Sequence, residues 1–150
     1  MAGRRTIKSE PCPVARSVDL IGDRWVLLIV RDAFDGVRRF GDFQRNLGVA
    51  RNILTDRLRL LVAEGILASQ PASDGSAYLE YVLTPKGSDL FAVIVSLRRW
   101  GEHHLFARDE PRSVLVRRST GRVVGDLGLR TADGREVAPE ETYVRKVDAG

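Results

Sequence analysis

Six arginines stand close together between residues 37 and 60 of this 150-residue sequence, with only two aspartates among them. Six positive charges against two negative give +4, which equals the formal net charge of the whole chain. Guanidinium groups bind phosphates and the edges of bases, so such a cluster is typical of a surface that binds nucleic acid. The arginines are Arg38, Arg39, Arg45, Arg51, Arg57 and Arg59, and the aspartates are Asp42 and Asp56.

Within segment 50–64, apolar residues recur every three or four positions, which predicts a helix with one buried face. Its polar face is suited to the DNA major groove, which admits one α-helix. Taken alone, such a helix is more often a solvated surface helix. The side chains expected to face DNA are Arg51 or Arg59 for a forked contact to guanine, Asn52 for adenine, Thr55 for a phosphate or a thymine methyl, and Asp56 for cytosine or a neighbouring arginine.

Three arginines precede this helix, namely Arg38, Arg39 and Arg45. They are suited to phosphate contacts, which fix position and salt dependence without reading sequence. Segment 71–77, downstream of the helix, contains an Asp-Gly pair that predicts a hairpin turn, and its tip has no Lys or Arg. The tip residues expected to meet the minor groove or the backbone are Ser73, Asp74 and Gly75.

The elements predicted around this stretch have the order of a winged helix-turn-helix. Pro13 suits a first helical turn, Asp23 an N-cap and Gly65 a C-cap. We expect helices at 13–21, 24–34, 39–47 and 50–64, strands at 66–70 and 78–83, and one long helix at 84–106. The predicted fold class is mainly α with a small β component, a dimeric winged helix-turn-helix with a C-terminal β-rich extension.

The long helix predicted at 84–106 is apolar around most of its circumference. One small domain cannot cover so wide an apolar surface, and a second subunit is the simplest cover. The interface residues expected on it are Phe91, Ile94, Leu97, Trp100 and Leu105. The predicted organisation is a flexible N-terminal arm at 1–10, a winged-helix DNA-binding and dimerisation domain at 11–108, and a β-rich C-terminal extension at 109–150.

Several classes of protein are disfavoured by composition. Apolar runs such as Val26 to Val30 are far short of the ~20 residues that span a membrane, and the N-terminus has no apolar core of a secretory signal. We therefore expect a cytoplasmic protein with no membrane partner. His103 and His104 are adjacent and point apart on a helix, so no metal site is expected. No nucleotide-binding or hydrolase motif is present, and neither a cofactor nor an enzymatic activity is expected.

Taken together, short motifs spread over about residues 11–106 resemble the HxlR-type transcriptional regulators, whose fold is similar to that of the MarR group. The resemblance is carried by Cys12-Pro13-Val14, Leu20-Ile21-Gly22-Asp23-Arg24-Trp25, Leu27-Leu28-Ile29, Gly36, Arg38-Arg39-Phe40, Leu54-Thr55-Asp56-Arg57-Leu58, Glu64-Gly65-Ile66, Glu80-Tyr81, Leu83-Thr84-Pro85-Lys86-Gly87 and Leu97 to Trp100.

The resemblance implies a homodimeric bacterial repressor or activator that binds double-stranded DNA at a pseudo-palindromic operator. It implies that helix 50–64 is the recognition helix and that the first helix, with Val14 and Val18, shares the dimer interface. The family commonly has a serine at the position of Ala50, so this chain has a weaker N-cap there and one expected phosphate contact is in question. Arg57 matches a family position that we interpret as structural.

Cys12, the single cysteine, matches the family's N-terminal cysteine, which in some members senses oxidants or electrophiles. It is therefore a possible redox sensor, through an intersubunit disulfide if the two copies lie near the dimer axis. The competing interpretation is a small buried apolar residue.

Two alternatives to a DNA-binding regulator stay open at this stage. The first is a protein–protein adaptor that keeps the winged-helix fold without binding DNA, which Asp56 and the absence of Lys and Arg at the hairpin tip favour. The second is a sensor of an unknown small-molecule effector, or a modest hydrolase, at the dimer interface. The residues that could line such an apolar pocket are Trp25, Tyr81, Phe91 and Trp100.

Overall fold

The computed structural model describes residues 10–147, so the arm predicted at 1–10 lies outside the described residues except for Glu10. The chain divides into two compact units, Met1–Ile94 and Val95–Gly150. Their boundary falls within one helix, and each unit is taken by itself below. No helix among the described residues is long and apolar enough to cross a membrane.

The first unit begins with two helices whose starts are set by their local sequence. Helix α1 (Pro13–Ile21) has proline at its first position, and the Cys12 sulfur at its N-cap accepts from a backbone N–H one turn on. Helix α2 (Arg24–Phe34) is capped by Asp23, whose carboxylate accepts from two backbone N–H groups at 2.9 and 3.0 Å. Both ranges agree with the sequence prediction.

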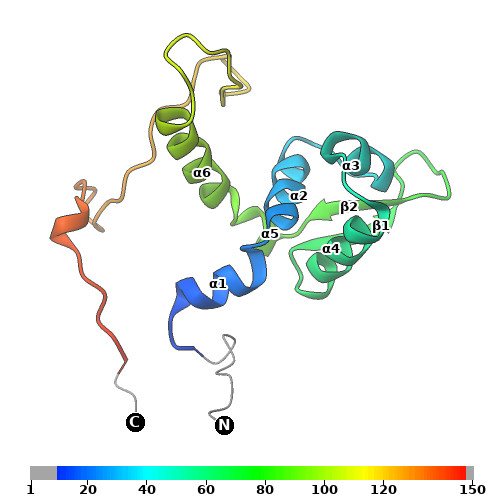
Figure 1. The fold of residues 1–150 in the computed structure, drawn as a ribbon, viewed down its shortest axis with the longest axis horizontal. Coiled ribbons are helices and arrows are strands. Elements are labelled where there is room, and N and C mark those ends of the chain that lie inside the picture. The colour runs from blue at the N-terminus through cyan, green and yellow to red at the C-terminus, as the bar shows by residue number, and fades with distance from the viewer. Residues whose placement is uncertain (1–9, 148–150) are drawn as a thin grey trace. The chain divides into compact units, whose positions relative to one another are not determined.

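A tight turn joins the two helices that follow. Helix α3 (Phe40–Leu47) ends at Gly48, whose φ of +60° lies in the left-handed region that favours glycine. Helix α4 (Arg51–Ala63) is followed by Gly65 with φ of +70°. These two helices start and end within one residue of the predicted bounds, and they form the helix-turn-helix pair of Figure 1.

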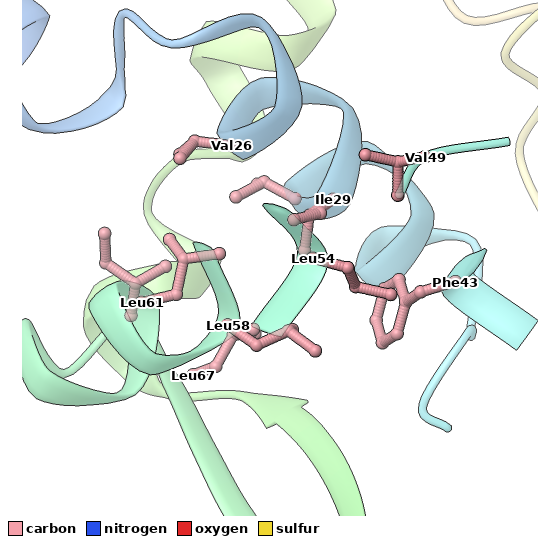
Figure 2. Packing of buried hydrophobic residues seen from close by; sticks show 10 residues of the cluster. Val26, Ile29, Phe43, Val49, Leu54, Leu58, Leu61 and Leu67 are labelled. Carbon is pink, nitrogen blue, oxygen red and sulfur yellow. The ribbon is translucent and has the colours of Figure 1, made fainter. Parts of the chain in front are cut away.

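Helix α4 is held in place by a face of leucines. Leu54, Leu58 and Leu61 are at most 1% exposed and pack against apolar side chains of α2 and α3. Figure 2 shows Leu54 beside Phe43 of α3 and Leu61 on the side of Val26 of α2, within one cluster of buried residues. Because the buried face is fixed, the opposite face of α4 must point into solvent.

The wing is a two-stranded antiparallel hairpin of β1 (Leu67–Pro71) and β2 (Leu79–Leu83), with Leu67 opposite Leu83. The loop between the strands projects beyond α3 and α4 (Figure 1). On its other edge β2 meets the segment before α3: the Tyr81 N–H donates to the Arg38 carbonyl at 2.7 Å. Strand β2 is therefore flanked on both sides, which ties the wing to the entry of α3.

The prediction of a single helix at 84–106 is wrong. The structure has two helices there, α5 (Pro85–Ser88) and α6 (Phe91–His104). The break has a tertiary cause. A Cβ atom at Gly87 would lie 2.1 Å from the carbonyl oxygen of Ile66, so this glycine lets α5 pack directly on the backbone at the start of the wing. Glycine in a helix interior also weakens the helix.

The second unit comprises the rest of α6 and the C-terminal extension, residues 105–147 as described. Two turns form in this segment, with Gly121 at φ +66° and Gly134 at φ +85°. Each turn is closed by one isolated bridge, and a short 3-10 helix follows at Pro139–Glu141. Within 105–147 no strand forms, so the predicted β-rich character is not confirmed. Most of this segment's side chains are exposed, and no buried apolar set holds strands together.

Polar contacts, rather than a core, hold the extension to α6 within this unit. Arg99 forms an ion pair with Glu102 at 2.9 Å and donates to the Gly125 carbonyl at 2.8 Å. Arg98 donates to the side chain and the backbone of Ser113. The extension therefore keeps large apolar side chains exposed, Leu127 and Leu129 among them.

Candidate nucleic-acid interface

The outer face of α4 carries the predicted base-reading residues. Arg51, Asn52, Asp56 and Arg59 are exposed, and Thr55 is half-buried. Neither Arg51 nor Arg59 forms an ion pair with another described residue, so both guanidinium groups keep their full charge for a ligand. The Arg51 guanidinium lies over the ring of Phe40 in α3, 5.3 Å from its centroid. The structure thus brings the predicted set onto one solvent-facing helix surface.

Arg57 belongs to α4 but faces inward. Its Nε and Nη2 atoms donate to the two carboxylate oxygens of Asp23, at 3.2 and 3.1 Å. This two-point pair raises the pKa of Arg57 and lowers the pKa of Asp23 below its usual 3.8. The same carboxylate caps α2, so Arg57 joins α4 to the start of α2, in line with the structural role expected for it.

The first turn of α4 shows two departures from an ideal DNA-reading helix. Ala50 is the N-cap and makes no side-chain cap bond, as the missing serine implies. The Thr55 hydroxyl donates to the carbonyl oxygen of Arg51 at 2.9 Å. Because that hydrogen is already used, Thr55 offers DNA its methyl group and an acceptor oxygen, and a phosphate contact requires its side chain to rotate.

The three arginines predicted to contact phosphates are each paired with an acid. Arg38 Nη1 lies 3.5 Å from Glu80 Oε2, Arg39 pairs with Asp74, and Arg45 pairs with Asp42 on the same face of α3. None of these three pairs was predicted from the sequence.

Arg39 brings to the wing the positive charge that the hairpin tip lacks. Its guanidinium reaches the Asp74 carboxylate at the tip and lies 5.7 Å from the ring centroid of Tyr78. The hydrogen bond to Asp74 raises the pKa of Arg39. The tip residues Ser73, Asp74 and Gly75 are all exposed. Asp74 also accepts from the N–H of Ser76 at 3.0 Å, which, with Arg39, holds the pKa of its carboxyl well below the usual range.

Glu80 of β2 lies between the wing loop and the segment before α3. Its side chain is buried, with a relative exposure of 3%. The Ser73 N–H and hydroxyl donate to Oε1 at 3.2 and 3.0 Å, and this bonding lowers the pKa of Glu80 although burial opposes it. The β2 alternation could have pointed to it, because a carboxylate on the buried face of a strand requires partners.

A groove of about 660 Å³ separates the wing from α3 and the start of α4. Its lining includes Arg39, Arg45 and Arg51 from the side of α3 and α4, and Tyr78 and Tyr81 from the wing. Its walls therefore combine fixed positive charge with flat aromatic surfaces, a combination that suits a sugar–phosphate backbone.

The expected dimer residues are mostly exposed within the single chain. Val14 and Val18 on α1 are 69% and 60% exposed, and α1 buries none of its residues. Leu97, Trp100 and Leu105 are also exposed. Phe91 is also exposed, although its ring centroid lies 5.3 Å from that of Phe34. Ile94 differs, because it packs against the core of its own unit.

Cys12 is half-buried, and its sulfur accepts from the Ala15 N–H at 3.4 Å. Among residues 10–147, no group of three or more His, Cys, Asp or Glu side chains could hold a metal ion.

Comparison with known proteins gives consistent results. Residues 20–109 match the family described as HxlR-like helix-turn-helix. The HTH-type transcriptional regulator Rv3095 of Mycobacterium tuberculosis, itself uncharacterized, is 43% identical over 124 residues, covering 83% of this chain and 78% of that protein. The relatives found are transcriptional regulators rather than enzymes.

Solved structures confirm the predicted winged helix-turn-helix fold. PA1607, a candidate transcription factor, is 50% identical, covers 93% of this chain and 98% of its own, and superposes with a TM-score of 0.87. The redox regulator HypR in its oxidized form is 31% identical, covers 64% of this chain and all of its own, and has a TM-score of 0.58. Since 93% of 150 residues exceeds the length of the first unit, the match to PA1607 takes in much of the C-terminal extension.

Proposed function

The chain belongs to the HxlR-like helix-turn-helix family of transcriptional regulators, and from this premise we propose that it binds specific DNA sites as a homodimer. Helix α4 enters the major groove and the hairpin β1–β2 contacts the flanking backbone. The observation that carries the proposal is the outer face of α4: Arg51, Asn52 and Arg59 stand exposed on a helix whose other face is locked into the core.

The division of roles follows from the charges. Arg51, Asn52 and Arg59 read base edges, because they are exposed and the two arginines have no acidic partner among the described residues. Asp56 stands on the same face as an acceptor for cytosine, and Thr55 offers its methyl group to thymine. Arg38, Arg39 and Arg45 contact phosphates by sharing their guanidinium groups between an acid and the DNA.

Dimerisation is supported by apolar surface that the single chain leaves uncovered. The exposed residues are Val14 and Val18 on α1, Leu97 and Trp100 within α6, and Leu105 just beyond the end of α6. In a symmetric dimer each subunit presents one α4 to one half-site, so the operator is a pseudo-palindrome with half-site centres about 34 Å apart or a multiple of that distance.

The experiment is to recover bound fragments from genomic DNA and derive their shared half-site, then to measure affinity for that site at several salt concentrations. Wild-type protein is expected to bind with steep salt dependence, and Asn52→Ala to lose discrimination at one base position. Arg135→Ala removes an exposed positive charge from the extension and shows how much of the affinity and salt dependence comes from net charge alone. An unchanged base preference for Asn52→Ala would show that α4 is not the reading helix.

The alternative of a winged-helix adaptor is favoured by one observation, the acids that neutralise Arg38, Arg39 and Arg45. An adaptor needs no free positive surface. If wild-type protein enriches no genomic fragment even at low salt, where phosphate contacts are strongest, the adaptor takes the place of the regulator.

We also propose Cys12 as the point at which an oxidant acts on the regulator. Its sulfur is half-buried at the start of α1, beside the exposed Val14, and the neighbour HypR is named a redox regulator. Treatment with diamide is expected to give a disulfide-linked dimer on a non-reducing gel, and Cys12→Ser to remain a monomer on that gel. A wild-type protein that stays monomeric there, with unchanged DNA affinity, excludes this switch.

A further inference from the structure

Glu80 is one of two charged residues that the structure buries, together with Asp32. Burial of an ionised carboxylate is costly unless donors surround it. Glu80 lies beside the proposed DNA surface, and its contacts with Ser73 and Arg38 indicate why a buried acid stands there.

The two carboxylate oxygens of Glu80 hold two different segments. Oε1 accepts from the backbone N–H and the hydroxyl of Ser73, which opens the wing loop. Oε2 lies 3.5 Å from Arg38 Nη1 and has no closer hydrogen-bond partner among the described residues. One side chain therefore joins the wing loop to the segment that leads into α3.

The backbone repeats this connection. Glu80 pairs with Gln70 of β1 on one side and forms an isolated antiparallel bridge with Arg39 on the other. The strand fixes the backbone of Glu80. The Glu80 side chain therefore fixes the position of the Ser73 loop and the direction of the Arg38 guanidinium. The Arg38 side chain is 52% exposed, so it can hold Glu80 with one nitrogen and a ligand oxygen with another.

We propose that Glu80 is a positioning residue for DNA binding, acting by holding Arg38 and the Ser73 loop where both meet the same stretch of phosphate backbone. The inference rests on the proposed DNA binding and adds to it a role for a buried acid. Glu80 itself touches no DNA.

The proposal predicts a change in DNA affinity opposite to the one expected when an acid near DNA is neutralised. Removing a negative charge near DNA ordinarily strengthens binding, because phosphates repel carboxylates. If Glu80 instead positions Arg38, its neutralisation weakens binding. Glu80→Gln is the suitable change, because its amide oxygen can still accept from Ser73 while its NH₂ group cannot attract a guanidinium. The matched control is Asp42→Asn, which neutralises a half-exposed acid on α3.

We expect Glu80→Gln to weaken binding to the selected operator by about tenfold and to reduce the slope of log affinity against log salt by about one, the signature of one lost phosphate contact. Arg38→Ala is expected to show the same two changes, and the double variant to be no weaker than Arg38→Ala alone. Asp42→Asn is expected to bind as tightly as wild type or more tightly.

Other outcomes overturn the proposal. Tighter binding by Glu80→Gln would make Glu80 a repulsive charge only. A lowered melting temperature with an unchanged salt slope would make it a purely structural residue, as would additive losses in the double variant. If Glu80→Gln does not fold, Ser73→Ala replaces it: the proposal requires that its loss of affinity, about threefold, disappears in the Arg38→Ala background.

The design separates this inference from the proposed function. Wild-type protein that binds no operator, or that binds with Asn52→Ala unaffected, contradicts the proposed function itself. Wild-type protein that binds, loses affinity on Arg38→Ala, and keeps or gains affinity on Glu80→Gln contradicts only the role of Glu80.

Discussion

The proposed DNA surface has two regions that treat their arginines in opposite ways. On the outer face of α4, Arg51 and Arg59 have no acidic partner among the described residues. In the segment before α3, in α3 and at the wing, each candidate arginine faces an acid: Arg38 with Glu80, Arg39 with Asp74, and Arg45 with Asp42. The two regions carry the same residue type in different electrostatic states.

This difference separates reading from positioning. An unpaired guanidinium can turn to meet either base or phosphate, and its charge is fully available to the ligand. A paired guanidinium is held in one direction, and part of its attraction for phosphate is offset by the neighbouring acid. The α4 face is therefore suited to strong, sequence-dependent contacts, and the wing region to weaker contacts that set orientation.

The largest loss of DNA affinity is expected from Arg51, which has no acidic partner among the described residues, in comparison with Arg39, which pairs with Asp74. Arg51→Ala should cost about 1–3 kcal/mol of binding free energy at the operator and relax the preference at one base pair, because an unpaired reading contact is lost. Arg39→Ala should weaken binding to operator and random DNA equally. Competition binding with both DNAs measures each loss. Equal losses on operator and random DNA for Arg51→Ala would remove the distinction between the two regions.

A second comparison lies within α4, between Arg57 and Arg59. Arg57→Ala should lower the free energy of unfolding by about 1 kcal/mol, because the two hydrogen bonds to Asp23 are lost. Arg59→Ala should leave stability unchanged and weaken DNA binding. Both variants are measured by urea denaturation and by operator binding. Urea denaturation should show a loss of stability for Arg57→Ala only, and operator binding a loss of affinity for Arg59→Ala only. A binding defect in fully folded Arg57→Ala would place Arg57 among the reading residues.

A smaller effect of opposite sign is expected at the wing. Asp74→Asn should tighten DNA binding by about twofold to threefold, because Arg39 is released from its partner and a negative charge leaves the surface. The gain should shrink as salt rises, since exposed charges are screened. Titrations at two ionic strengths check this. Weaker binding would indicate that Asp74 holds Arg39 in its working position.

The smallest effect expected near neutral pH is the dependence of stability on pH through Glu80 and Asp74. The folded-state pKa values of Glu80 and Asp74 lie below their ordinary values of 4.5 and 3.8, so their contribution to stability is present above those values and is lost as pH falls through the lowered ones. Melting temperature should therefore be insensitive to these groups between pH 7 and 5 and decline below about pH 4. In Glu80→Gln that acid decline should be shallower.

The fold was predictable where the signals were local. Pro13 and Asp23 mark helix starts and Gly48 and Gly65 mark helix ends through their own backbone geometry, so the first four helices agree with prediction to within one residue. The break between α5 and α6 was not predictable, because it depends on the approach of Gly87 to a backbone carbonyl in another element.

The same limit applies to the candidate site. The sequence indicated which residues face outward on α4, since helical periodicity alone decides that. It did not indicate that the arginines before α3 are neutralised, because Arg39 and its partner Asp74 are 35 residues apart and meet only through the wing's register. The alternation of β2 could indicate that Glu80 faces inward, but its link to the Arg38–Arg39 segment depends on a third segment beside β2, which no strand pattern reveals.

The contact between Gly87 and Ile66 has a mechanical consequence. The Ile66 carbonyl lies just past the end of α4 and accepts from the Thr84 N–H at 3.1 Å, while Lys86 donates to the carbonyl of Glu64 at 2.7 Å. Helix α4, the base of the wing and α5 are thus joined at one place by backbone contacts and by the side chains of Thr84 and Lys86. Because the three elements share these contacts, we expect a displacement of α5 to move α4 and the wing together.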